Sequence, residues 1–307
     1  MESGNLLIVT PACPAELQDW NGLRSLKNWS VEAHLGEGVH TSVALVSCAN
    51  STQLFALKMY HRDRLTPELT QQVRREIKLH ASCRSSRVIP LYAAFEDDDG
   101  IYLLQQRAAL GDLFSHIADS GGFLFEDEAK TIVWCLVNAV AALHQQGCMH
   151  RDVKPENVLL DGEGSALLTD FGLALDTAEQ VAGARVGTID YLAPEVVAIA
   201  QRAAGGPAPV DRPCTQDAAG CDSYGPATDV WALGILAYEL MVGGPPFEAD
   251  TKDGTYANIL GGQLCIPSHL AKLAQDFIRE ALERDPSKRP TAAQLLQHPW
   301  MLARELC

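Results

Sequence analysis

Two short polar motifs near the middle of the chain carry the side chains best suited to chemistry. The first is the octet HRDVKPEN at residues 150–157, and the tripeptide DFG follows at residues 170–172. Asp152 is placed to accept a proton, and Lys154 supplies a point charge for a phosphate group. Together with a nearby amide and a second carboxylate, these side chains indicate chemistry on a phosphate.

Two apolar runs between these motifs predict a hairpin. Residues 158–160 and 166–168 are apolar, and Asp-Gly at 161–162 bounds the first run, which is typical of two buried strands joined by a turn. A hairpin folds its two ends back together, so we expect Asn157 and Asp170 to lie side by side. Their oxygen atoms suit a hard cation such as Mg²⁺, with a phosphate completing the coordination shell.

The octet and the DFG tripeptide resemble the catalytic and magnesium-binding loops of the eukaryotic protein kinases. A lysine two residues after Asp152 is the serine/threonine-specific form. A lone His-Arg-Asp triplet could be a solvated turn, but the whole octet followed by DFG at this distance leaves that alternative little weight. The resemblance implies an α+β, bilobal protein-kinase fold, with a small antiparallel β lobe, one main helix in it, and a larger, mostly helical lobe. The domains are an N-terminal extension at 1–28, the smaller lobe at 29–105, a hinge at 106–112, the larger lobe at 113–302 and a tail at 303–307.

Composition bounds the class of protein. The chain has 307 residues, 47% of them apolar, with a mean hydropathy near zero, which is typical of a soluble globular protein. We find neither a membrane-spanning run nor a secretory signal. The nine cysteines form no Cys-x-x-Cys pair, which favours free thiols in a reducing compartment. The net charge of −15 argues against nucleic-acid binding. From these features together we expect an intracellular protein, cytoplasmic or nuclear or both, that binds neither nucleic acid nor a membrane.

A lysine and a glutamate in the smaller lobe form a predicted pair. Lys58 ends a β-like run, and Thr66-Pro67 supplies an N-cap and a first-turn proline for a following helix. Glu76 falls on that helix. A lysine in a strand is usually an edge residue facing water, but the resemblance pairs Lys58 with Glu76 and assigns the pair to the α- and β-phosphates of ATP.

Further residues of this lobe are candidates for nucleotide binding. Gly36 and Gly38 stand where a backbone could close over phosphates without Cβ clashes, although Thr41 replaces the third glycine of the family pattern. Residues 101–106 predict a strand that enters the hinge, whose backbone would bond the adenine. Asp112 could bind the ribose, read a basic substrate residue or cap a helix. The resemblance implies that the nucleotide and its Mg²⁺ contact Leu35, Gly36, Gly38, Val43, Ala56, Lys58, Gln105, Gln106, Ala108, Asp112, Asn157, Leu159 and Asp170, of which Asn157 and Asp170 bind the metal.

In the larger lobe, helical spacing of apolar residues predicts a long helix at 126–146. Residues 229–241 are apolar almost all round and predict a buried helix. Burying Asp229 unpaired would be costly; in the family, the matching aspartate accepts N–H bonds from the catalytic loop. The resemblance also implies an ion pair between Glu195 and Arg289.

The activation segment, residues 173–192, departs from the family pattern. Its usual phosphorylation position is Ala184, which has no hydroxyl, so Arg151 lacks the phosphate that would order the segment. We expect activity without phosphorylation there, unchanged by phosphatase. The segment could instead be ordered by Asp176, Glu179 or an activating partner protein, with Thr177 as the fallback phosphorylation site.

A second departure is an insertion at 200–223, rich in Ala, Gly and Pro, which predicts a flexible surface loop. A redox role for its Cys214 and Cys221 receives little weight.

Within the family, the motif at 187–195, the polar His80 and the motif at 245–250 look most like the Aurora kinases.

The resemblance implies a serine/threonine protein kinase that transfers the γ-phosphoryl group of ATP to protein hydroxyls. Asp152 would orient the substrate hydroxyl and accept its proton, Lys154 would stabilise the γ-phosphoryl charge, and Thr188 would tie the two together. An Arg-x-Ser/Thr-like preference follows from acidic residues at Asp112, Glu156 and Glu239.

The main alternative is a pseudokinase, a nucleotide-binding scaffold that acts through protein contacts. Thr41 and Ala184 favour it, whereas the complete set of catalytic residues opposes it. A small-molecule kinase on the same fold is disfavoured by the complete Ala-Pro-Glu motif at 193–195.

Overall fold

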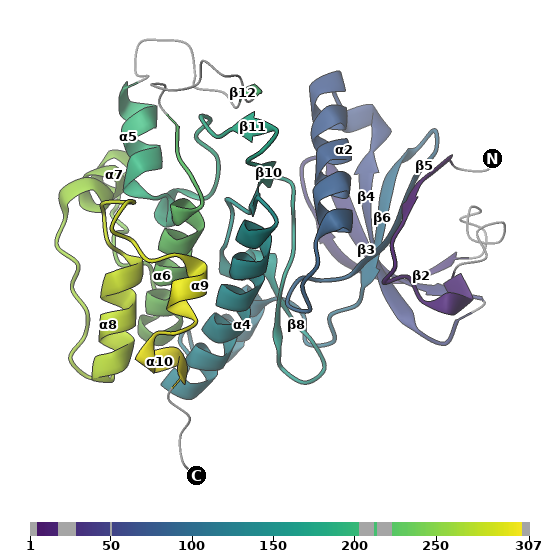
Figure 1. Ribbon diagram of the computed structural model, residues 1–307. Coiled ribbons are helices and arrows are strands. Elements are labelled where there is room, and N and C mark those ends of the chain that lie inside the picture. The colour runs from purple at the N-terminus through teal and green to yellow at the C-terminus, as the bar shows by residue number, and fades with distance from the viewer. Residues whose placement is uncertain (1–4, 18–28, 50, 203–211, 214–222, 303–307) are drawn as a thin grey trace. The chain divides into compact units, whose positions relative to one another are not determined.

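Figure 1 shows a computed structural model of the chain, which describes residues 5–17, 29–49, 51–202, 212–213 and 223–302. The chain divides into two compact units, residues 1–109 and 110–307. The division falls within the segment predicted as the hinge, 106–112. In the described ranges, no helix is both long and apolar enough to cross a membrane, and none of the six cysteines is in a disulfide.

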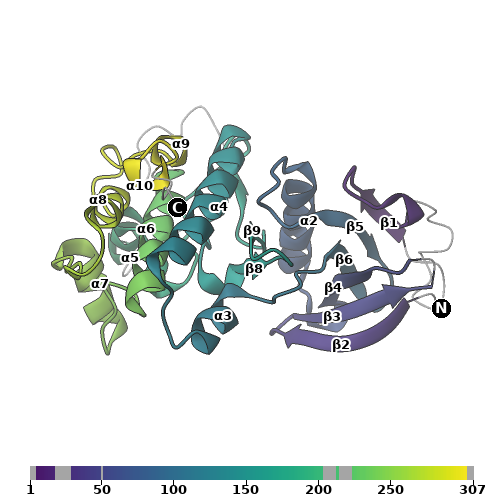
Figure 2. The same ribbon diagram turned by 90° about the horizontal axis from the view of Figure 1, so that it is seen from below.

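The first unit is built on one sheet with the strand order β1-β5-β6-β4-β3-β2. Each strand runs antiparallel to its neighbours. Figure 2 shows helix α2 against one face of this sheet. The elements are β1 (Asn5–Val9), β2 (Trp29–Glu37), β3 (Thr41–Cys48), β4 (Leu54–His61), α2 (Pro67–Ser82), β5 (Leu91–Glu96) and β6 (Gly100–Gln106), with 3₁₀ turns at Ala15–Leu17 and Arg62–Arg64.

Alternating side chains divide the core of this unit into two layers. Because successive strand residues point to opposite faces, Leu103 of β6 packs with Val73 and Ile77 of α2, whereas Leu104 belongs to the other layer. The Thr66 side chain caps α2 at its N-terminus. The helix predicted after Thr66 is therefore confirmed, and it is anchored by its apolar side.

Residues 5–17 belong to the first unit, although they were predicted to be part of an N-terminal extension. β1 pairs with β5 at the edge of the sheet. Cys13 and Leu17 are 4% and 0% exposed and join the core layer opposite α2. The apolar run at 6–9 is too short to predict a strand alone. The rest of the predicted extension lies outside the described residues.

The described part of the second unit is mostly helical, with three two-stranded sheets. Its helices are α3 (Leu113–Asp119), α4 (Glu126–Gln145), α5 (Pro194–Arg202), α6 (Ala227–Val242), α7 (Lys252–Gly261), α8 (Lys272–Ala281), α9 (Ala292–Leu295) and α10 (Pro299–Leu302), with 3₁₀ turns at Pro155–Asn157 and Ile189–Tyr191. The strand pairs are β7 (Cys148–Met149) with β10 (Leu175–Asp176), β8 (Val158–Leu160) with β9 (Ala166–Leu168), and β11 (Gln180–Val181) with β12 (Arg212–Pro213).

Helix α6 is the centre of the second unit, as its apolar sequence predicted. It lies between α4 and α8 (Figure 1), and thirteen of its sixteen residues are buried, as expected for a helix that is apolar on every side. A Cβ at Gly234 would lie 2.8 Å from the Cβ of Ala281 on α8. The glycine therefore permits the close approach of the two helices.

The predicted insertion at 200–223 is described only in part. Residues 200–202 complete α5, and Arg212–Pro213 form β12, paired with the activation segment through β11. These described stretches are a helix end and a two-residue strand. Residues 203–211 and 214–222, including both cysteines considered for a redox role, lie outside the described residues.

Replacing Leu17 with alanine should lower the free energy of unfolding of the first unit by about 2–5 kcal/mol, the range for large-to-small changes in a core. Urea unfolding followed by tryptophan fluorescence measures the change. The matched control is Leu35→Ala at a position 54% exposed, expected within about 0.5 kcal/mol of the wild type. Equal stability of the two variants would show that residues 15–17 are not part of the core.

Candidate active site

In the first unit, the predicted partners Lys58 and Glu76 form a buried ion pair. Lys58 Nζ on β4 lies 2.9 Å from Glu76 Oε1 on α2, and the Glu76 side chain is 2% exposed. The Tyr60 hydroxyl donates to Glu76 Oε2 at 2.5 Å. A buried carboxylate is costly unless both oxygens are bonded, and here both are. Sequence reasoning missed Tyr60, although it lies two residues from Lys58 and therefore on the same face of β4.

The glycine turn between β2 and β3 is tight. The Gly38 N–H donates to the Thr41 carbonyl at 2.8 Å, and a Cβ at Gly38 would lie 2.7 Å from Thr41 Oγ1. A side chain at position 38 would therefore displace Thr41. Glycine at position 38 therefore leaves room for the Thr41 hydroxyl.

The other predicted nucleotide-binding residues of this unit lie on strands β2, β3, β4 and β6 or directly after β6. Val43 on β3 pairs with Lys58, and Ala56 on β4 pairs with Gln105 on β6. Leu35 and Gly36 lie near the C-terminal end of strand β2. Gln106 is the last residue of β6, and Ala108 comes two residues after it.

In the second unit, the predicted hairpin is present. β8 and β9 pair with Val158 opposite Leu168, and the Thr169 N–H donates to the Asn157 carbonyl at 2.9 Å. This bond closes the open end of the hairpin one residue before Asp170. The backbones that carry the two predicted metal ligands are therefore brought together.

Asp112 caps helix α3, which is one of the alternatives left open for it. Its Oδ1 accepts from the Ser115 N–H at 2.7 Å, and its Oδ2 accepts from the Ser115 hydroxyl at 3.1 Å. Asp112 also forms an isolated β-bridge with Leu159 of β8. Two of the predicted nucleotide-binding residues are thus neighbours in this unit.

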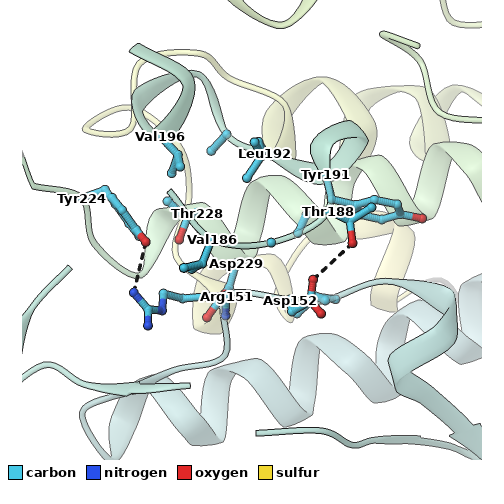
Figure 3. Close-up of a pocket in the computed structure, with 14 residues that line it drawn as sticks. Arg151, Asp152, Val186, Thr188, Tyr191, Leu192, Val196, Tyr224, Thr228 and Asp229 are labelled. Carbon is cyan, nitrogen blue, oxygen red and sulfur yellow. Dashed lines mark hydrogen bonds between the residues drawn. The ribbon is translucent and has the colours of Figure 1, made fainter. Parts of the chain in front are cut away.

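The Asp152 carboxylate is surrounded by Lys154 and Thr188, which were predicted to act with it, and by Asn157, which was predicted as a metal ligand. Asn157 Nδ2 donates to Asp152 Oδ2 at 2.7 Å, and Lys154 Nζ lies 3.0 Å from the same oxygen. Thr188 Oγ1 donates to Asp152 Oδ1 at 3.4 Å (Figure 3), and Lys154 Nζ donates to Thr188 Oγ1 at 2.8 Å. The catalytic loop and the activation segment therefore converge on one carboxylate.

The donor set at Asn157 and Asp170 fits Mg²⁺. Because Asn157 Nδ2 is directed to the carboxylate and the backbone carbonyl of Asp152, its amide oxygen points away and is the atom suited to a cation. Asp170 adds a carboxylate. Within the described part of the chain, no group of three or more His, Cys, Asp or Glu side chains is placed to hold a metal ion.

One buried carboxylate on α6 holds the start of the catalytic loop. Asp229, 1% exposed, accepts the N–H of His150 at 2.9 Å and the N–H of Arg151 at 2.7 Å, and His144 Nε2 lies 2.8 Å from it. Burial by itself would raise the pKa of Asp229, but the hydrogen bond and charge of His144, with the charge and backbone bond of His150, lower it below its usual value. The predicted resolution of this buried charge is confirmed.

The predicted ion pair between Glu195 on α5 and Arg289 is also present. Arg289 Nη1 and Nη2 donate to the two oxygens of Glu195 at 2.9 and 3.1 Å. This bidentate pair, with a fully buried arginine side chain, is the strong form of such a contact. It fixes the segment that follows Thr188.

Acidic side chains gather around Glu239 on α6. Burial raises the pKa of Glu239, and the negative charges of Glu156, Asp190 and Glu248 add to the increase, although a hydrogen bond from the Tyr191 hydroxyl opposes it. We call these four carboxylates the acidic cluster. Glu156 and Glu239 were predicted; Asp190 and Glu248 come from other segments and were missed.

Comparison with known proteins agrees with this geometry. The family model for the protein kinase domain matches residues 29–301. The chain belongs to the protein kinase family. The Aurora kinase of Schizosaccharomyces pombe is 33% identical over 270 residues, which are 87% of this chain and 70% of that protein. Aurora kinase C of Mus musculus is 32% identical over 278 residues, 90% of this chain and 92% of that protein.

The family and these relatives make the chain a serine/threonine protein kinase with protein substrates, and the pseudokinase alternative is not favoured. Protein kinases in general use ATP and Mg²⁺. The resemblance to Aurora kinases drawn from the motifs is confirmed.

Asp229→Asn should destabilise the second unit by about 3–5 kcal/mol, because it breaks a buried charged network. The pKa of Asp229 in the folded protein is lowered from its usual value of 3.8. The difference in free energy of unfolding between the wild type and Asp229→Asn should therefore be complete above pH 3.8, and it should shrink as the pH falls through the folded-state pKa. Urea unfolding at several pH values measures this.

The control is Asp276→Asn, a carboxylate at the surface with partners Lys272 and Arg279; its loss should change the free energy of unfolding far less, because solvent screens exposed ion pairs. If Asp229→Asn is no more harmful than this control, Asp229 does not hold the loop.

Proposed function

We propose that Asp152 is the catalytic base of this kinase and that its preferred substrates carry arginine close to the target serine or threonine. The observation that carries the first part is the convergence of Lys154, Asn157 and Thr188 on the Asp152 carboxylate. The acidic cluster around Glu239 supports the second part.

In this proposal the hydroxyl oxygen of the substrate attacks the γ-phosphorus of ATP while its proton passes to Asp152. A bond forms between that oxygen and phosphorus, and the bond from phosphorus to the departing ADP oxygen breaks. Lys154 stabilises the charge on the transferred group. Thr188 and Asn157 hold the carboxylate in one orientation, so that most of the acceleration comes from positioning and electrostatics.

For the nucleotide, we assign Lys58, oriented by Glu76, to the α- and β-phosphates, and Asn157 and Asp170 to Mg²⁺. The metal ion, when bound, neutralises phosphate charge. Support comes from the buried ion pair in the first unit and the outward amide oxygen in the second. We assign Gly36 and Gly38 to the phosphates. The residues assigned to the adenine end of the nucleotide are Leu35, Val43, Ala56, Gln105, Gln106, Ala108 and Leu159. Asp112 is assigned to the nucleotide as well, although its carboxylate also caps helix α3.

The acidic cluster is suited to a guanidinium group. Burial raises the pKa of Glu239, and the negative charges of Glu156, Asp190 and Glu248 raise it further. An arginine would relieve this repulsion and could bond a carboxylate bidentately. Peptides with an arginine close to the target residue would therefore be preferred.

Asp152→Asn should reduce phosphoryl transfer from radiolabelled ATP to a panel of basic peptides by about 10²–10⁴-fold, the usual contribution of a general base. ATP binding, followed by fluorescence of a nucleotide analogue, should stay within about two-fold. Asp276→Asn serves as the control and should match the wild type. Nucleotide binding by the wild type without any transfer would favour a scaffold, and an unchanged rate in Asp152→Asn would remove Asp152 from its role.

The selectivity for arginine should depend on pH through Glu239. Its pKa is raised from 4.5 and only the anion attracts arginine, so kcat/KM for an arginine-containing peptide should rise as the pH increases through that raised pKa. In Glu239→Gln, kcat/KM for this peptide should fall about 10-fold, or about 1.4 kcal/mol, and lose this part of its pH dependence. A peptide with norleucine in place of arginine is the control. Equal losses for both peptides would contradict the assignment.

A further inference from the structure

The activation segment carries no phosphorylatable side chain at its usual position, yet Arg151 of the catalytic loop is held firmly. Arg151 Nε donates to the Leu173 carbonyl at 2.7 Å, at the start of that segment. Its Nη1 donates to the hydroxyl of Tyr224 at 3.1 Å. Figure 3 shows the Tyr224 hydroxyl directed at the Arg151 guanidinium.

The same hydroxyl reaches the position where the phosphate would be attached. Tyr224 Oη donates to the backbone carbonyl of Ala184 at 2.6 Å. A phenol can accept one hydrogen bond and donate another, and here it accepts from Arg151 and donates to Ala184. One side chain thus joins the two groups that a phosphate on residue 184 would join.

The backbone and ring of Tyr224 are held in place as well. The Tyr224 N–H donates to the Ala182 carbonyl at 3.1 Å, in an isolated antiparallel bridge. Its ring packs against a buried group made of Met149, Leu175 and Ala182. The hydroxyl is therefore fixed by its surroundings and does not need a ligand to position it.

We propose that Tyr224 is a positioning residue that replaces the activating phosphate of this kinase. It ties Arg151, the neighbour of Asp152, to Ala184, four residues before Thr188. Thr188 then donates to the Asp152 carboxylate. The tie is built into the chain and cannot be removed by a phosphatase, so it keeps the segment ordered permanently. This inference rests on the proposed function, since it assigns Tyr224 to the site of Asp152.

The test uses Tyr224→Phe in the full chain, which removes only the hydroxyl. We expect kcat/KM for a basic peptide to fall about 10-fold, the scale of losing a hydrogen bond to a charged group. Cleavage by trypsin after the exposed Arg185, followed by mass spectrometry, should become several-fold faster. Phosphatase treatment of the wild type should leave its kcat/KM unchanged.

The matched control is Tyr238→Phe, which removes another hydroxyl of this unit that donates to a backbone carbonyl, that of Cys265 at 3.0 Å. It should leave both readouts at wild-type values. In the Tyr224→Phe background, genetically encoded phosphoserine at position 184 should restore most of the lost kcat/KM, whereas plain serine should not. A merely structural role for Tyr224 would not give this rescue.

Two results would overturn the proposal: kcat/KM and cleavage in Tyr224→Phe that stay within two-fold of the wild type, or a loss that phosphoserine at position 184 does not restore. If the wild type itself transfers no phosphate, the proposed function fails separately. The cleavage rate after Arg185 then decides alone whether Tyr224 orders the segment.

Discussion

The second unit depends on one buried carboxylate that accepts two successive backbone N–H groups. Asp229 bonds the N–H of His150 and of Arg151, and Arg151 adopts a left-handed backbone conformation with φ +67°. A non-glycine residue in that region costs free energy, so the turn persists because its surroundings enforce it. The carboxylate supplies two of the contacts that enforce it.

Because this turn is fixed, three successive side chains leave it in three directions. His150 is buried, with Nε2 3.0 Å from the Thr169 carbonyl beside the hairpin. Arg151 reaches the activation segment through Leu173, and Asp152 faces its polar partners. The charge of one aspartate on the central helix therefore organises the hairpin, the segment and the proposed base together.

The chemical motifs could be predicted from sequence because they are local. The hairpin at 158–168 follows from apolar runs and a turn, and the pair Lys58 and Glu76 follows from a strand, a helix cap and a family pattern. What could not be predicted depends on distant residues. Tyr224 lies 40 residues from Ala184 and 73 from Arg151, and no local pattern marks that contact.

Two other features escaped prediction for different physical reasons. The strand at residues 5–9 lies at the edge of its sheet, so its short apolar run carries little signal although Leu17 beyond it is fully buried. The acidic cluster assembles carboxylates from separate segments, including Asp190 and Glu248. Repulsion among like charges opposes folding, and such arrangements tend to occur at functional sites.

Hydrogen exchange at the backbone amides of His150 and Arg151 tests most directly whether Asp229 holds the catalytic loop. Both amides lie in a loop, where exchange is ordinarily fast, but both donate to a buried carboxylate. We predict that they exchange as slowly as the amides in the middle of α6, through global unfolding of the unit. Exchange as fast as that of exposed loop amides would contradict the account.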